Sequence, residues 1–110
     1  MMLKKKFLKT KCKVTFELPS GIEGAEEVYL VGDFNNWDER SLLMEKKVDT
    51  KKKVTKFSMT LDLDLGRDYQ YRYLVNGKDW HNDWDADKYV SNPFSGDNSV
   101  VDTHPETDSD

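Results

Sequence analysis

Three segments of the chain carry apolar residues at every second position, which is the period of a β-strand that buries one face. The segments are 11–18, 56–65 and 69–75. The third meets Asn76-Gly77, which favours a two-residue type I′ turn with 78–81 as the return strand. No segment has a helical period, so a parallel sheet with crossover helices is excluded. About six or seven short strands separated by turn residues predict an all-β sandwich.

The remaining segments complete a one-domain organisation. Residues 27–31 form a short β-rich run that stops at Gly32, and the lysine-rich segment 45–53 indicates a solvated hairpin or sheet edge. We expect a long ordered loop over 82–98 and a closing strand over 99–102. The predicted boundaries are a basic N-terminal extension at 1–10, the sandwich at 11–102 and an acidic disordered tail at 103–110.

Composition excludes several classes of function. The net charge is only −4 and the basic runs lack interleaved aromatic residues, so nucleic acid and membranes are not expected partners. No apolar segment near the start is long enough for a signal peptide. Cys12 is the only cysteine and falls on the apolar side of its strand. We therefore expect a buried thiol, no disulfide and a cytoplasmic location.

The acidic residues do not form a recognisable catalytic or metal site. Several aspartates lie close together over 79–87, but a calcium loop that began at Asp79 would need glycine and glutamate where Trp84 and Val90 stand. The two histidines are too few and too poorly placed for zinc, and no Ser-His-acid set or glycine-rich phosphate loop is present. The sequence predicts no metal, no cofactor and no enzymatic activity.

The three tryptophans lie in polar, turn-rich segments rather than in alternating apolar runs. Such positions can expose an indole face beside hydrogen-bonding groups, the combination that recognises the apolar face and hydroxyl rim of glucose. A large ring can equally cap one end of a sandwich core. For Trp37 and Trp80 the surrounding residues leave both interpretations open, whereas for Trp84 we predict the capping role.

Three motifs, in order along the chain, give the sequence a family resemblance. They are VYLVGDFNNW at 28–37, YQYRYLVNG at 69–77 and NPFSGDNSVV at 92–101. They resemble the family 48 carbohydrate-binding modules, of the early-set or isoamylase N-terminal type, of glycogen branching and debranching enzymes and of the β subunit of AMP-activated protein kinase. The resemblance covers roughly residues 11–102. It implies an all-β, immunoglobulin-like sandwich of about seven strands that binds α-1,4-linked glucan.

The resemblance also implies where a carbohydrate site would lie. Carried over from the kinase-type module, the site comprises Trp37, Arg72, Trp80, Phe94 and Asn98. Arg72 stands where that module has lysine, which keeps the charge but alters the donor geometry. The implied partners are an α-glucan polysaccharide or maltooligosaccharide and a glycogen branching or debranching enzyme. The competing hypothesis is a protein-interaction or regulatory domain that docks on such an enzyme without binding sugar.

Overall fold

The computed structural model describes residues 3–19, 22–84, 86–92 and 96–105, which form nine β-strands and one short 3-10 turn. These elements are β1 (Lys4–Phe7), β2 (Lys11–Glu17), β3 (Val28–Gly32), the 3-10 turn η1 (Asp33–Asn35), β4 (Glu45–Asp49), β5 (Val54–Asp64), β6 (Asp68–Val75), β7 (Asp79–His81), β8 (Lys88–Asn92) and β9 (Gly96–Asp102). The all-β prediction is confirmed. Within the described ranges, no helix has the length and apolar character needed to cross a membrane.

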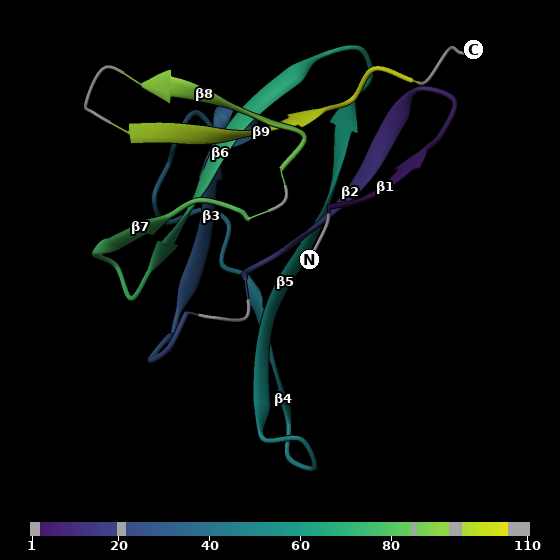
Figure 1. Ribbon diagram of the computed structural model, residues 1–110. Helices are drawn as coiled ribbons and strands as arrows, with labels where there is room; N and C mark the ends of the chain where they lie inside the picture. Colours follow the sequence, from purple (N-terminus) through teal and green to yellow (C-terminus); the bar gives the residue numbers. More distant parts are fainter. Residues whose placement is uncertain (1–2, 20–21, 85, 93–95, 106–110) are drawn as a thin grey trace.

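The strands form two antiparallel sheets that enclose one core (Figure 1). The first sheet has the order β1-β2-β5-β4, and the second has the order β3-β6-β9-β8. β7 pairs with the part of β6 that β9 does not reach. Alternation along β2 and β6 sends one set of side chains inward, and the buried set is Cys12, Val14, Phe16, Tyr69, Tyr71 and Tyr73. The Cys12 thiol is buried and free, as predicted.

Two strands depart from the sequence prediction. β8 lies within 82–98, so the prediction of a continuous loop there is wrong. β1 lies in the segment 1–10, where the sequence predicts only a basic extension. Both strands form sheet edges, and an edge strand buries few side chains, so its apolar alternation is weak. The described residues therefore form nine strands where the resemblance implies about seven.

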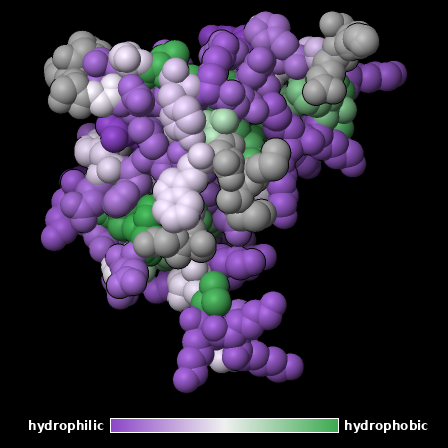
Figure 2. Space-filling view, in the orientation of Figure 1, coloured by the Kyte–Doolittle hydropathy of each residue, from purple (hydrophilic) through white to green (hydrophobic). Residues whose placement is uncertain are grey.

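Both predicted hairpins are present. Asn76 and Gly77 have φ values of 56° and 73°, and the Lys78 backbone N donates to the Val75 carbonyl at 3.2 Å, as a type I′ turn requires. The β4–β5 hairpin projects away from the sandwich, and every residue of β4 is exposed (Figure 1). Figure 2 shows mainly hydrophilic side chains on this projection. The lysine-rich segment is thus a solvated sheet edge, as the sequence predicts.

Candidate functional site

The second sheet presents one face to the side opposite the core, and we call it the outer face. Along β6 the tyrosines point inward, so Gln70, Arg72 and Leu74 point outward. Trp80 on β7 pairs with Leu74, and Val31 on β3 pairs with Arg72, so these side chains share that face. The outer face comprises Tyr29, Val31, Gln70, Arg72, Leu74, Trp80, Asn98 and Val100.

Three apolar residues of the outer face are buried. Val31, Leu74 and Val100 are buried, although they are not part of the core cluster between the sheets. Trp80, which pairs with Leu74, keeps 37% of its surface exposed. An indole of this kind offers a partly exposed apolar surface on a rigid strand.

A chain of amide hydrogen bonds fixes Asn98 on the outer face. The Asn98 Nδ2 donates to Gln70 Oε1 at 2.9 Å, and Asn92 Nδ2 donates to Asn98 Oδ1 at 3.2 Å. These bonds decide which end of the Asn98 amide is the donor and which is the acceptor. The two bonds therefore orient the amide, and Asn98 as a whole is 9% exposed.

Arg72 brings a polar group with no partner to the same face. Its Nε is buried and has no hydrogen-bond partner among the described residues. A buried N–H donor without an acceptor costs about 1–3 kcal/mol. The guanidinium also supplies several donors in one plane, which suits neighbouring hydroxyl groups.

Trp37 is held in an unusual backbone conformation at the end of β3. Asn36 and Trp37 have φ values of 57° and 58°, in the left-handed region that bulky residues rarely adopt. Trp37 Nε1 donates to Asp33 Oδ1 at 2.9 Å, while Asp33 Oδ2 accepts from the Gln70 backbone N at 2.7 Å. Asp33 therefore ties the Trp37 loop to β6. Backbone strain of this kind costs about 1–3 kcal/mol and clusters at functional sites.

The family model for the glycogen recognition site of AMP-activated protein kinase matches residues 20–108, which is most of the chain and includes the whole outer face. The chain belongs to this family. No curated protein matches it. Membership supports glycogen binding, and a carbohydrate-binding module of this family is non-catalytic in itself.

The structure places most of the residues that the glycogen-recognition resemblance implies. Arg72, Trp80 and Asn98 come together on the outer face, and Trp37 is joined to it through Asp33. Phe94 lies outside the described residues. Gln70 is an addition to the residues that the resemblance implies, because its Oε1 accepts from Asn98 Nδ2.

The prediction for Trp84 is wrong. The residue is 58% exposed, so its ring does not cap the core of the glycogen-recognition domain. Asp83 takes the inward position instead and is only 4% exposed. The sequence does not predict that Asp83 is buried and Trp84 exposed, because both residues lie in an irregular polar segment.

Asp83 anchors the segment between β7 and β8. Its Oδ2 accepts from the Tyr71 hydroxyl at 2.7 Å and from the Tyr73 hydroxyl at 3.0 Å, and its backbone N donates to Ser99 Oγ at 2.8 Å. Burial raises the pKa of the Asp83 carboxyl, and the tyrosine hydrogen bonds oppose that shift. Burial, followed by the neighbouring acidic groups, raises the pKa of both phenols. This network is structural, since its polar groups satisfy one another.

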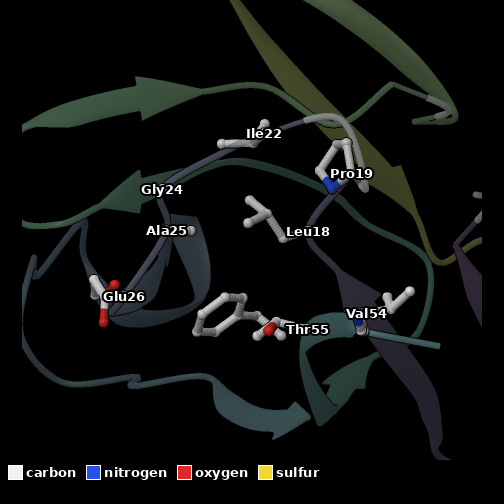
Figure 3. Close-up of a pocket in the computed structure, with 10 residues that line it drawn as sticks. Leu18, Pro19, Ile22, Gly24, Ala25, Glu26, Val54 and Thr55 are labelled. Carbon is white, nitrogen blue, oxygen red and sulfur yellow. The ribbon is translucent and has the colours of Figure 1, made fainter. Parts of the chain in front are cut away.

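A separate pocket of about 380 Å³ opens between the loop after β2 and the start of β5 (Figure 3). Its described lining includes the apolar residues Leu18, Ile22, Val54 and Phe57 and the polar residues Glu26, Lys53 and Thr55. None of the family-implied site residues lines it. The pocket therefore lies apart from the outer face and is not part of the candidate site.

One group of side chains has the spacing of a metal site. Asp68, Asp102 and His104 have ligand atoms within 4.8 Å of one another. Lys88 lies 2.7 Å from Asp68, and His104 Nδ1 lies 2.6 Å from Asp102. These contacts account for the cluster as an exposed ion-pair network at the end of β9.

Proposed function

We propose that this domain binds α-1,4-linked glucan, such as glycogen or a maltooligosaccharide, through the outer face and the Trp37 loop. Trp37 and Trp80 would stack on sugar rings, Arg72 and Asn98 would bond their hydroxyls, and Phe94 would add an apolar contact. The observation that carries the proposal is the convergence of an exposed indole, an oriented amide and an arginine on one sheet face.

The chemistry of the face fits a neutral sugar chain. Stacking one sugar ring removes on the order of 50 Å² of apolar surface from water, worth roughly 1 kcal/mol before the terms specific to aromatic rings are added. A few such contacts, after the cost of association, give a dissociation constant of about micromolar to millimolar for a maltoheptaose-sized ligand. Such weak single contacts suit a polymer, because a branched polysaccharide offers many chains at once.

The proposed setting is the cytoplasm, which the free, buried thiol of Cys12 supports. The protein partner that we propose is a glycogen branching or debranching enzyme, which would bind the same polysaccharide. Docking on that enzyme without sugar binding is the competing function, and the maltoheptaose titration below separates the two.

Trp80→Ala is expected to weaken binding of maltoheptaose and glycogen by about tenfold or more, because the variant removes a stacking surface worth at least about 1.4 kcal/mol. The thermal midpoint should change by less than about 4 °C, since the ring is part-exposed on a short edge strand. Trp37→Ala should weaken binding by a similar factor.

Isothermal titration calorimetry with maltoheptaose measures the loss of affinity, and differential scanning calorimetry measures the change in thermal midpoint. Trp80→Phe is the matched control and should keep part of the affinity, because it keeps a flat aromatic ring. Unchanged affinity in Trp80→Ala would place the glucan site elsewhere, and no measurable affinity in the unaltered protein would favour the protein-docking function.

Glucan binding is also expected to depend little on salt. The ligand is neutral, and the lysine-rich β4–β5 hairpin belongs to the first sheet, whereas the outer face belongs to the second. Affinity for amylose measured between about 20 mM and 500 mM sodium chloride should change by less than about threefold. A fall of about tenfold or more would indicate a polyanionic partner in place of a neutral glucan.

A further inference from the structure

The hairpin formed by β4 and β5 concentrates positive charge on a chain whose net charge is negative. Residues 45–56 contain six lysines and two acidic residues, whereas the whole chain has a net charge of −4. The lysines are Lys46, Lys47, Lys51, Lys52, Lys53 and Lys56. The hairpin projects from the sandwich (Figure 1), so a partner can reach it. Charge that is concentrated in this way attracts a partner of the opposite sign.

Most of these lysines have no acidic partner. Two of them, Lys46 and Lys47, lie 3.8 and 3.9 Å from a carboxylate. The other four form no ion pair within the described part of the chain, and they are Lys51, Lys52, Lys53 and Lys56. Lys47 and Lys56 are directly opposite each other across the hairpin, a position in which like charges disfavour the folded state. A bound anionic group reduces such repulsion.

The turn that joins β4 to β5 presents three of the unpaired lysines on a fixed backbone. Asp49 Oδ1 accepts from the backbone N of Lys51 at 3.0 Å and from that of Lys52 at 3.2 Å. Lys53 has a φ of 53°, in the left-handed region that few residues with a Cβ adopt. All three residues are exposed. A partner would therefore spend little free energy on ordering the backbone of this turn.

β4 is also an open sheet edge. It pairs with β5 on one side, it is the last strand in the order of its sheet, and each of its residues is exposed. An edge strand presents unpaired backbone N–H and C=O groups, which an extended polypeptide can meet. Val48 on this strand is 59% exposed and offers an apolar contact as well. Lysines keep two such edges from pairing with each other, but they favour a strand that carries carboxylates.

We propose that the β4–β5 hairpin docks an acidic segment of a protein partner, which lies in an extended conformation along the open edge of β4. The carboxylates of this segment contact the unpaired lysines, and its backbone pairs with β4. The open edge selects a polypeptide over a nucleic acid, because a phosphodiester backbone cannot extend a β-sheet. Residues 45–56 also contain no aromatic residue on which a base could stack. The hairpin belongs to the first sheet, so this inference does not depend on the proposed glucan site of the second.

The test uses a fluorescently labelled peptide of about ten alternating glutamate and threonine residues, whose binding is followed by anisotropy at about 50 mM sodium chloride. The test variant combines Lys51→Gln, Lys52→Gln and Lys53→Gln. Its affinity for the peptide is expected to fall by about tenfold or more, because the variant removes three of the unpaired charges.

The matched control combines Lys4→Gln, Lys6→Gln and Lys9→Gln, which removes the same charge from exposed lysines of another region. Its affinity for the peptide should stay within about threefold of the original. A second peptide, with proline in place of each threonine, lacks the N–H groups that pair with an edge strand and should bind about fivefold more weakly or worse. Circular dichroism reports whether each variant is folded.

Several results would overturn the inference. Absence of peptide binding, or an equal loss in both variants, shows that the hairpin is not a docking site for acidic segments. Equal binding of the proline peptide overturns the pairing along β4. Tighter binding of single-stranded DNA of the same charge makes the partner a nucleic acid, and dimers of the domain alone that are lost in the test variant and kept in the control make it a second copy of this chain. Sedimentation velocity measures those dimers.

Discussion

Gly32→Ala is expected to lower the free energy of unfolding by about 3 kcal/mol, because the added methyl group has no space. A Cβ at this position would lie 2.5 Å from the Gln70 carbonyl oxygen, 2.8 Å from Tyr71 Cβ and 2.9 Å from Phe34 Cζ. The φ of Gly32 is −175°, which any residue adopts, so the cost comes from overlap and not from backbone strain. Relief requires β3 and β6 to move apart, and that movement would also disturb the outer face.

Urea denaturation followed by circular dichroism measures this loss as a lower midpoint at an unchanged m-value. Gly96→Ala is the matched control, because among the residues that the structure describes its Cβ would meet Asn92 Nδ2 alone, at an ordinary 3.5 Å. That variant should change the free energy of unfolding by less than about 0.5 kcal/mol. A Gly32→Ala protein as stable as the wild type would contradict the close approach of β3 to β6.

Stability should fall steeply above about pH 10, by about 2.7 kcal/mol for each pH unit. Burial and nearby acidic groups raise the pKa of Tyr71 and Tyr73 well above the ordinary value of a phenol. Above about pH 10 these two phenols lose their protons only in the unfolded chain, so the unfolded state is favoured as pH rises. The stabilisation is therefore complete below pH 10 and is lost on the alkaline side.

Urea midpoints measured at several pH values above 10 test this expectation, and absorbance near 295 nm reports when the phenolates form. Tyr71→Phe removes one of the two protons, so the slope of stability against pH should fall by about half. An unchanged slope in Tyr71→Phe would show that other groups cause the alkaline loss. Phenolate absorbance from Tyr71 in the folded protein at pH 11 would contradict the burial of that hydroxyl.

The parts of the fold that follow from the sequence are those where alternation is decided by burial. β2, β5 and β6 each have one face in the core, so every second residue is apolar and the pattern is clear. β8 has no such pattern, because its inward residue Tyr89 stays part-exposed beside Asp83. Edge strands such as β8, and the segment around Asp83 next to it, depend on contacts with distant parts of the chain. The local sequence does not predict such contacts.

The candidate site also combines residues whose placement follows from the sequence with residues whose placement depends on tertiary contacts. Alternation alone places Arg72 opposite the tyrosines of β6, and the structure confirms that placement. Trp80 reaches the outer face only through the register of the β6–β7 hairpin, and Asn98 is oriented only by Gln70 and Asn92. The position of Trp84 depends on Asp83 being drawn inward by two tyrosine hydroxyls, a tertiary effect that no local pattern indicates.

The contacts of Lys5 bring the first and the last strand of the domain together. Its Nζ lies 2.8 Å from Asp87 Oδ2 and donates to the Asp102 carbonyl at 3.1 Å, so β1 of one sheet meets β9 of the other. A short linker could join these two regions, and the exposed turn between β4 and β5 could then be opened without breaking a core contact. Each strand would keep its neighbours in such a permuted chain. We therefore expect the sandwich to depend on which strands touch and to tolerate a different order of connection.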